Sequence, residues 1–445
     1  MRLINRDFTL LWAGQSVSQT GDYVFDTTLT LWVGTELLRG GALAPLAVSG
    51  LLVTVAVATL LVAPIAGVLV DRWDHRRTML GSDLIRAVLI GAVSVLAFLP
   101  KGTLPTGVTV AAVYLAVFLN AAVSQYFNPA RFAIIGEVVP AELRTKAAGI
   151  GQSTQAIAGI VGPPLAAPLL FTAGVQWALV LNALSYVGSY LLVGAVRTER
   201  RTTRESDARA SVPAELREGL RLALGNQVVR ALLQVIALIS VGIGALNTVN
   251  VFFLQVNLHS DVKWFGTLET ALGLGTLLGA VLATPLQSRL GTRRALPLAL
   301  VAMGALLLGY ARLGAFWPAL GLLAVLGVAL AVVNAGFAPL LIEATPKEYL
   351  GRVFSVINPV QQVANVLGMA LAGWLASTAL RGFHGEVGGL HLGGYDTVLT
   401  GSALLVLAGG AYAVGALWPT AGRAGAGSPG QDGGAGAAVA PEAVP

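Results

Sequence analysis

Apolar residues in this chain fall into long runs rather than into the short alternations of soluble helices and strands. Each run approaches the about 20 residues that an α-helix needs to cross a membrane, and polar residues, prolines or glycines mark the breaks. The pattern predicts an all-α integral membrane protein with twelve transmembrane helices. The expected spans are 8–36, 46–70, 79–99, 107–127, 147–171, 175–196, 228–255, 264–286, 295–312, 317–341, 355–380 and 397–418.

One long polar stretch, residues 197–227, separates the first six spans from the last six. It is basic, and Ala214 to Leu224 within it could form an amphipathic helix on the membrane surface. We therefore expect an N-terminal six-helix bundle over 1–196, a cytoplasmic linker over 197–227 and a C-terminal bundle over 228–418. The segment 419–445 is rich in glycine, alanine and proline and is expected to be a disordered tail.

The two sets of spans repeat each other at an offset of 206 residues. Glu137, Pro140 and Gln155 then align with Glu343, Pro346 and Gln361. Parallel six-helix repeats that face each other across a central, mid-membrane substrate site are one architecture of secondary transporters. We expect two pseudo-symmetric bundles. The remaining aligned pairs are Glu142 with Glu348, Ala158 with Ala364, Gly162 with Gly368, Leu165 with Leu371 and Ala166 with Ala372.

Charge is scarce and unevenly placed. Hydrophobic residues make up 55% of the 445 residues and charged residues only 11%, too few to cover a soluble surface. With the N-terminus inside, 22 of the 28 lysines and arginines lie in or beside cytoplasmic loops, as the positive-inside rule requires. The net charge of +6 therefore indicates membrane topology rather than nucleic-acid binding. We expect a multi-pass protein of the cell membrane with both termini in the cytoplasm.

Catalytic and metal-binding patterns are not found in the sequence. There is no cysteine, the four histidines fall in predicted loops, and no phosphate-binding glycine loop is present. We expect no enzyme activity, no cofactor and no metal site, and a chain that works as a monomer. Any uphill transport would have to use an ion gradient.

The loop after the second span carries a specific motif. It contains Gly67, the pair Asp71-Arg72 and the pair Arg76-Arg77. It resembles the signature loop of the major facilitator superfamily, Gly-x-x-x-Asp-Arg-x-Gly-Arg-(Arg/Lys). The sequence departs from that pattern at Asp74, where the family has glycine, and at the additional His75.

Other segments resemble one branch of that superfamily, the one that contains macrolide-efflux proteins and the enterobactin exporter. They are Phe8 to Gln15, Gly21-Asp22, the Asp-Arg-x-Asp variant of the loop with Asp83 and Arg86 after it, and Phe127 to Ala130. The resemblance covers about residues 5 to 418. It implies a twelve-helix transporter that works by alternating access.

The resemblance also implies a cytoplasmic gate. In the family the loop aspartate, here Asp71, faces the start of the eleventh span, near Arg352 to Ser355, and latches the two halves together. Arg72, Arg76 or Arg77 could pair with Glu137 or Glu142 of the neighbouring loop. Alternatively, these arginines only enforce the topology.

Four charges are expected inside the spans: Asp22, Asp26, Arg86 and Glu269. Asp22 and Asp26 are four residues apart and share a helix face. Two carboxylates this close in a low-dielectric setting cannot both ionise cheaply, which favours proton coupling by this pair. Alternatively, Asp22 only ties its helix to a neighbour. We expect the whole stripe to line an aqueous path: Gln15, Gln19, Asp22, Asp26 and Thr30.

The other two charges receive different expectations. Arg86 is expected to join a cluster with Asp83 near the cytoplasmic side. Glu269 is expected nearer the outer surface, at a rim in contact with water, with proton coupling as the alternative.

Amide side chains mark the expected substrate cavity. These amides could form a neutral hydrogen-bonding surface for the substrate or, equally, connect neighbouring helices. Gly162-Pro163 in the fifth span resembles part of a motif of exporters in the superfamily. The amides are Gln15 and Gln19 in the first span, Gln152 and Gln155 in the fifth, Asn247 and Asn250 in the seventh, and Asn358, Gln361, Gln362 and Asn365 in the eleventh.

These features predict proton-driven export of a hydrophobic or amphipathic small molecule, such as a drug or siderophore-like metabolite. A proton-coupled uptake symporter and a lipid flippase of the same fold are alternatives. A membrane enzyme or receptor is disfavoured because it would need a catalytic cluster or a large domain outside the membrane.

Overall fold

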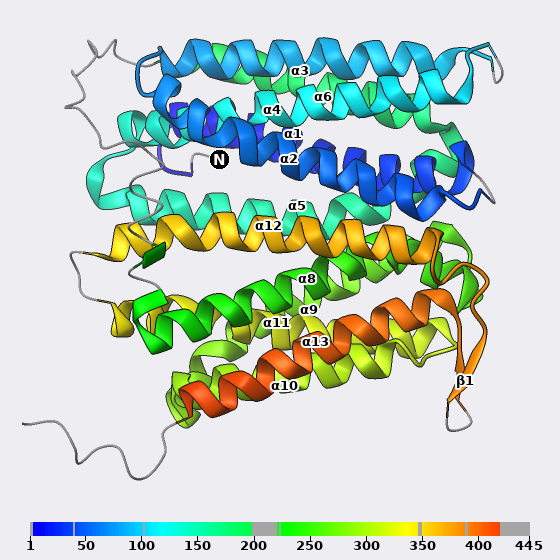
Figure 1. Ribbon diagram of the computed structural model, residues 1–445. Helices are drawn as coiled ribbons and strands as arrows, with labels where there is room; N and C mark the ends of the chain where they lie inside the picture. Colours follow the sequence, from blue (N-terminus) through cyan, green and yellow to red (C-terminus); the bar gives the residue numbers. More distant parts are fainter. Residues whose placement is uncertain are drawn as a thin grey trace, which may run out of the picture.

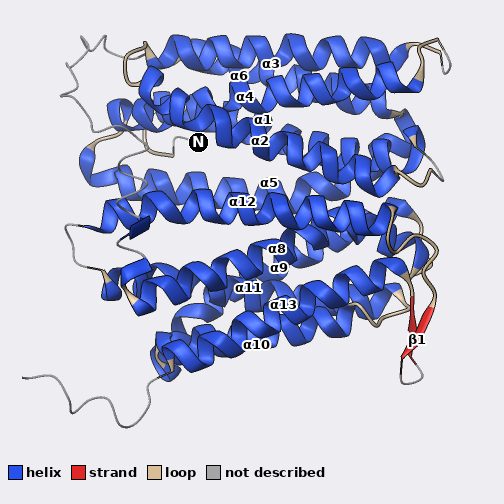
Figure 2. Cartoon of the chain, viewed as in Figure 1, coloured by secondary structure: helices blue, strands red, loops and turns tan. Residues whose placement is uncertain are grey.

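The computed structural model describes residues 3–38, 41–100, 103–197, 220–221, 224–345, 349–387 and 390–418. Within these ranges the chain forms twelve long helices and one short hairpin (Figures 1 and 2). The helices are α1 Arg6–Leu31, α2 Ala44–Val70, α3 His75–Phe98, α4 Thr106–Val138, α5 Arg144–Pro168, α6 Val175–Gly194, α8 Gln227–Val256, α9 Phe265–Leu290, α10 Thr292–Tyr310, α11 Phe316–Ala344, α12 Leu350–Ser377 and α13 Gly394–Leu417.

Short elements extend or join these helices. The π-helical turns Trp32–Leu37 and Leu169–Ala173 continue α1 and α5, and the 3₁₀ turns Ala141–Leu143 and Val262–Trp264 precede α5 and α9. Strands β1 Gly385–Val387 and β2 Leu390–Leu392 pair antiparallel, and the hairpin was not expected from the sequence.

The twelve predicted spans are confirmed, and each corresponds to one helix. The largest difference is α4, which continues to Val138 although the predicted span ended at residue 127. Pro129 lies inside α4, so this proline does not end the helix. Ten of the twelve are long and apolar enough to cross a membrane by composition alone; α1 and α12 are not among them. Those two helices carry the stripes Gln15–Thr30 and Asn358–Asn365, which lower their hydropathy.

Polar side chains fix where several helices begin. Asn5 accepts a hydrogen bond from the backbone N–H of Phe8 at the start of α1. Asp74 accepts one from the N–H of Arg77 at 2.7 Å and is the N-cap of α3. A side-chain acceptor at this position satisfies an N–H group that has no partner within the helix. Capping therefore explains why this chain has aspartate where the signature loop has glycine.

The helices form two bundles (Figure 1). In the first, which runs from blue to green, α1 packs against α5 and α6, and α3 packs against α4 and α6. In the second, α8 packs against α12 and α13, α9 against α11, and α10 against α11 and α13. The main contacts between the bundles are α2 with α12 and α5 with α9. The expected pair of six-helix bundles is confirmed.

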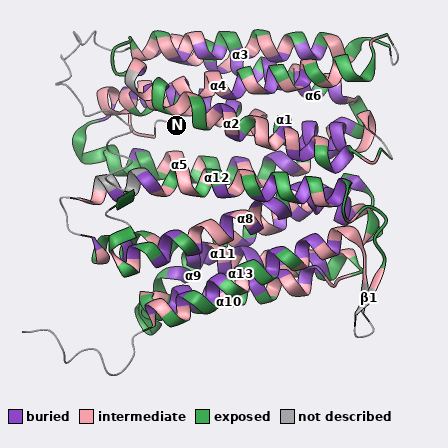
Figure 3. Ribbon diagram, in the orientation of Figure 1, coloured by how far each residue is buried: buried purple, intermediate pink, exposed green. Residues whose placement is uncertain are grey.

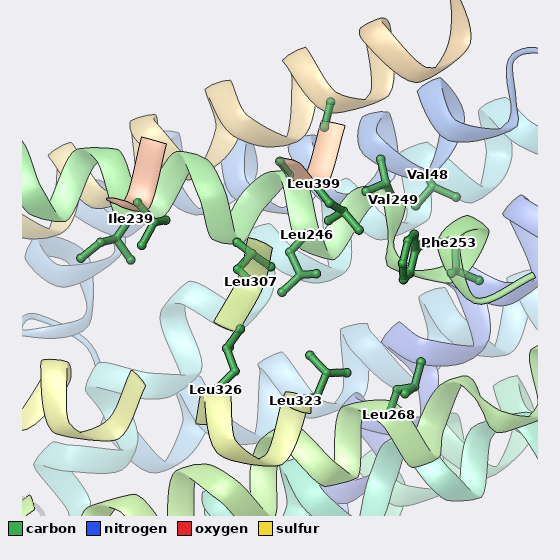
Figure 4. Packing of buried hydrophobic residues seen from close by; sticks show 14 of the residues in the cluster. Val48, Ile239, Leu246, Val249, Phe253, Leu268, Leu307, Leu323, Leu326 and Leu399 are labelled. Atoms are coloured by element: carbon green, nitrogen blue, oxygen red, sulfur yellow. The ribbon is translucent and has the colours of Figure 1, made fainter. Parts of the chain in front are cut away.

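Apolar side chains cover both the inside and the outside of the bundles. Buried residues run along the facing sides of the helices (Figure 3). Around α8, Ile239, Leu246 and Phe253 belong to a cluster that also takes in residues of α9, α11 and α13 (Figure 4). Large apolar side chains are also exposed, among them Val88, Leu191 and Val281 at 63%, 64% and 75%. Exposed apolar surface on membrane-length helices is the surface that lipid covers.

The two ends of the molecule differ. We call the end that carries the β1–β2 hairpin the hairpin end, and the opposite end, where α1 begins and α13 finishes, the terminus end (Figure 1). At the hairpin end the N–H of Leu46, on α2, donates to the hydroxyl of Ser377, on α12, at 2.9 Å. One turn into α9, Thr270 donates to the carbonyl of Ile160, on α5, at 2.9 Å. These bonds join the bundles on the hairpin side.

The internal repeat is visible in equivalent side-chain contacts at the terminus end. Glu137, at the end of α4, contacts His75, the first residue of α3, at 2.9 Å. Glu343, at the end of α11, contacts Arg293, at the start of α10, at 2.8 Å. Glu137 and Glu343 are the residues that the 206-residue offset aligns. In each bundle this contact therefore joins the end of the fourth helix to the start of the third.

The proposed division of the chain at 197–227 stays a prediction. Most of this linker, including most of the amphipathic stretch 214–224, lies outside the described residues, as does the tail 419–445.

Candidate functional site in the membrane core

A hydrogen-bonded cluster occupies the interior of the first bundle. Arg86, on α3, donates to a carboxylate oxygen of Asp22, on α1, at 2.9 Å and to the hydroxyl of Tyr186, on α6, at 2.7 Å. The Tyr186 hydroxyl in turn donates to the same oxygen of Asp22. Arg86 also donates to Asn120, on α4, at 3.2 Å. Four helices are therefore joined through one guanidinium group.

Burial makes this cluster depend on charge pairing. The Arg86 side chain is 6% exposed and the Asp22 side chain 31%. A charge inside a membrane protein needs a partner or a wet cavity, and Arg86 and Asp22 are partners of each other. The expected association of Arg86 with Asp83 is present, but Asp22 and not Asp83 supplies the ion pair. Arg86 pairs with Asp22, and Asp83 acts on it only as a further nearby charge.

Asp26 lies one turn beyond Asp22 on α1 and is exposed. On a helix of 3.6 residues per turn, Val17 lies two and a half turns earlier and therefore on the opposite side. Val17, which is 52% exposed, is on the outer surface, since Gly14 and Thr20 on either side of it pack against α6 and α5. Asp26 therefore shares the side of Asp22, and its exposed surface looks inward rather than toward lipid.

The second bundle contains a chain of three polar groups. The hydroxyl of Tyr310, on α10, donates to the side-chain oxygen of Asn250, on α8, at 2.6 Å. The Asn250 amide nitrogen then donates to the carboxylate of Glu269, on α9, at 3.3 Å. Tyr310 and Asn250 are buried, whereas Glu269 is partly exposed. No lysine or arginine pairs with Glu269 among the residues that the structure places.

Helix α5 lies between the acidic residues of α1, Asp22 and Asp26, and the acidic residue of α9, Glu269. A Cβ at Gly159 or Gly162 would meet Tyr23, next to Asp22 on α1. The neighbouring face of α5 meets α9, where Thr270 bonds to Ile160 and Gly266 packs against Pro163. Asp22 and Asp26 on one side and Glu269 on the other therefore flank the same turns of α5.

The predicted cavity amides divide into exposed and buried sets. Gln152, Gln155, Asn247, Asn358 and Gln361 are exposed, and Gln19, Gln362 and Asn365 are partly exposed. Gln15 and Asn250 are 7% and 2% exposed. Gln15 accepts a hydrogen bond from Arg131, on α4, at 3.4 Å, so these two amides connect helices rather than offer an open surface.

A small apolar recess lies beside the amides of α12. Its volume is about 120 Å³, and it is formed by α8, α11 and α12. Leu233, Phe337 and Ile357 are among its lining residues, with Asn334 as the polar member. A larger cavity of about 600 Å³ lies at the hairpin end, with Phe252, Gln255, His384 and Tyr395 in its lining.

The signature loop is placed at the terminus end. Asp71 is the exposed C-cap residue of α2, and Gly67 lies one turn before it. Arg76 donates to the carbonyls of Val193 and Gly194 at the end of α6, where a positive charge is favoured. Glu137 pairs with His75 instead of with an arginine of the loop, and Arg72 and Arg77 are exposed. The side chains of Arg352 and Ser355 lie outside those described, so the latch at Asp71 stays a prediction.

A family model described as the Major Facilitator Superfamily matches residues 11–369 and 235–440. The chain belongs to this superfamily. It is 26% identical over 371 residues to macrolide efflux protein A of Streptococcus pyogenes, and this match covers 83% of this chain and 89% of that protein. It is 29% identical over 332 residues to the multidrug efflux pump Tap of Mycolicibacterium fortuitum, over 71% of this chain and 77% of the pump.

Solved structures agree on the fold. An inward-facing bacterial homologue of the iron transporter ferroportin superposes with a TM-score of 0.70 at 16% identity, over 93% of this chain and 99% of that chain. The expected fold and the resemblance to macrolide-efflux proteins are thereby confirmed. The protein is a multi-pass membrane transporter of the major facilitator superfamily.

Sequence reasoning missed several members of the two polar groups. Tyr186, Asn120 and Tyr310 were not singled out, and Asp83 was not counted among the charges within spans although α3 contains it and it is fully buried. A signal for one of them exists in the sequence. Asn182, Ser185, Tyr186 and Ser189 recur at helical spacing on one face of the sixth span.

Proposed function

We propose that the protein is a proton-coupled exporter of a hydrophobic or amphipathic small molecule that works by alternating access. Protons from outside the cell bind to the Asp22/Asp26 pair, and their release to the cytoplasm drives the cargo outward. The plasma membrane is the expected location, with the terminus end and both termini on the cytoplasmic side.

The position of Asp26 is the observation that carries this proposal. Asp22 is already compensated by Arg86 at 2.9 Å, whereas Asp26 is one turn away, looks inward, and has no cationic partner among the described side chains. An unpaired carboxylate in contact with water in the middle of a membrane protein is suited to bind and release a proton. Arg86 supplies a direct counter-charge to Asp22 but not to Asp26, so the two acids can serve different parts of one cycle.

Contacts between the bundles support an inward-facing state. The bonds from Leu46 to Ser377 and from Thr270 to Ile160 join the bundles on the hairpin side. Gly34 packs against Phe252 at the same end. The exposed amides of α5, α8 and α12 would then be reached from the cytoplasm. Rocking of the bundles would open the hairpin end and expose the same groups to the outside.

The surfaces near the centre suit an amphipathic cargo. Asn247, Asn358 and Gln361 offer neutral donors and acceptors, and the recess at Phe337 and Ile357 offers a place for an apolar group. Ligand sites commonly combine an apolar wall with a few polar groups. The names of the relatives, a macrolide efflux protein and a multidrug efflux pump, point to the same kind of cargo.

A dye assay in cells that lack their own exporters tests the proposal. Cells that express the protein should hold less of a fluorescent amphipathic dye than cells with an empty vector, and a proton uncoupler should abolish the difference. Greater accumulation in the expressing cells would indicate an uptake symporter instead. Movement of labelled lipid without effect on the dye would indicate a flippase.

A further inference from the structure

The most unusual polar group in the first bundle is Asp83. It lies on α3, one turn before Arg86, and is 0% exposed. Neither of its carboxylate oxygens has a hydrogen-bond partner among the described residues. The hydroxyl of Ser189, on α6, also has no hydrogen-bond partner among the described residues. It lies close enough to the Asp83 carboxyl to influence its charge state.

An ionised carboxylate cannot remain cheaply in such a place. Removing a charge from water without a hydrogen bond or a direct counter-ion is very costly, and buried groups commonly become neutral instead. The charged groups that act on Asp83 are Arg86 on its own helix and Asp22 on α1. From the packed helix α6, the hydroxyl of Ser189 also acts on it. Arg86 already donates to Asp22, Tyr186 and Asn120.

We propose that Asp83 is a second proton-binding site, and that it holds a proton in the conformation described. Two carboxyl groups, Asp22 and Asp83, then share a single guanidinium. Arg86 compensates the one that is ionised, and the other is neutral.

The order of the groups along the membrane suggests how this site is used, and this step depends on the proton coupling proposed above. Asp26 lies nearest the hairpin end, followed by Asp22 with Arg86. Asp83 lies one turn of α3, about 5 Å, closer to the terminus end. A proton that binds to Asp22 removes the charge that holds Arg86. Arg86 can then stabilise the ionised form of Asp83, three residues away on the same helix face, and Asp83 releases its own proton toward the terminus end.

One proton is bound and one is released in this exchange, so charge is balanced. The cycle closes when the proton on Asp22 passes to Asp83 and Arg86 returns to Asp22. Ser189 is placed to hydrogen-bond with Asp83 in either form, because a hydroxyl can donate or accept.

Infrared spectroscopy of the purified protein in lipid nanodiscs tests the proton on Asp83 directly. At neutral pH the wild type should show the carbonyl stretching band of a protonated carboxylic acid. The variant Asp83→Asn should lose the Asp83 component of this band and Ser82→Ala should keep it. Asp22→Asn should weaken it, because this variant frees Arg86 for Asp83 as a proton on Asp22 does. Ser82 is the matched control, because it is the adjacent residue on α3 and is 5% exposed. A band that is unchanged in Asp83→Asn, or absent from the wild type, would overturn the proposal.

A transport measurement then tests the use of the site. Proteoliposomes that contain Asp83→Asn should exchange labelled dye for unlabelled dye as the wild type does, but lose dye export driven by a pH gradient. Retained gradient-driven export would refute the exchange through Arg86. If the wild type itself shows no gradient-driven export, the proposed function fails, and the infrared result still decides whether Asp83 holds a proton.

Discussion

Arg86 and Asp22 form an ion pair at 2.9 Å between α3 and α1, in a setting where the arginine is almost fully enclosed. Because the same guanidinium also contacts Tyr186 and Asn120, the pair connects four of the six helices of the first bundle. Its loss should therefore affect both the stability and the activity of the protein.

Replacement of Arg86 by alanine should destabilise the first bundle strongly. Removing one partner of a buried ion pair leaves an uncompensated charge and costs about 3–5 kcal/mol. The change can be measured as a lower unfolding temperature of the protein in detergent. The double variant Arg86→Ala/Asp22→Asn should recover part of this loss, because the unpaired carboxylate is removed as well. An unfolding temperature equal to that of the wild type would contradict the structural role of the pair.

The exposed ion pair of the second bundle, Arg293 with Glu343, should matter much less than the buried pair of Arg86 with Asp22. Arg293 and Glu343 are 46% and 56% exposed, and exposed ion pairs contribute about 0–1 kcal/mol. Glu343→Gln should therefore leave the unfolding temperature almost unchanged. A loss as large as that of Arg86→Ala would show that the terminus end depends on this contact.

The overall fold could be predicted from the sequence more completely than these contacts between helices. Apolar runs between polar, proline and glycine breaks indicated all twelve helices because a membrane demands a long apolar run for each crossing, although α1 and α12 are too polar to be recognised by composition alone. The repeat that aligns Glu137 with Glu343 correctly indicated two matching bundles. The i, i+4 spacing of Asp22 and Asp26 placed both on one face of α1, as it must on any helix.

Pairing between helices was harder to predict. Nothing in local sequence states that Arg86 on the third span reaches Asp22 on the first, or that Tyr310 reaches Asn250, because such contacts depend on how the helices pack. Arg86 was assigned to Asp83, its neighbour in sequence, and the two lie on one helix face. The capping role of Asp74 does not follow from the family pattern, which has glycine at this position; it depends on where α3 begins.

Glu269 should influence which cargo is exported. Its carboxyl group is partly exposed, accepts a hydrogen bond from a neutral amide and pairs with no lysine or arginine among the described residues, so a positively charged group of the cargo could bind there. Glu269→Gln should weaken export of a permanently charged cationic dye more than export of a neutral dye. The two export rates can be compared in the same cells. Equal loss for both dyes would show instead that Glu269 serves the transport cycle in general.

Gly266 should be essential for closing the hairpin end. A Cβ at this position would collide with the backbone of Pro163, across the contact between α9 and α5. Gly266→Ala should therefore favour the state that is open at the hairpin end. Gly321→Ala is the control, since nothing lies within 4 Å of a Cβ there.

Thiol labelling can measure this shift, because the chain has no cysteine. A cysteine introduced at Ser377, which is 3% exposed, should react faster with a maleimide when Gly266→Ala is also present. An unchanged rate would mean that α5 and α9 can close over the added methyl group.

The same approach tests the orientation in the membrane. Asp261 and Glu142 are both exposed, the first near the hairpin end and the second at the terminus end. In intact cells a membrane-impermeant maleimide should label Asp261→Cys and should label Glu142→Cys only after the cells are opened. The reverse pattern would place the termini outside.

Proton movement through the Asp26 variant tests the central claim most directly. Wild-type protein and Asp26→Asn would be reconstituted into liposomes that contain a pH-sensitive dye, and proton flux would be recorded when a transported substrate is added. The account predicts substrate-dependent proton flux for the wild type and none for Asp26→Asn, while substrate exchange without a gradient continues in both. Undiminished proton flux and uphill transport in Asp26→Asn would contradict the account.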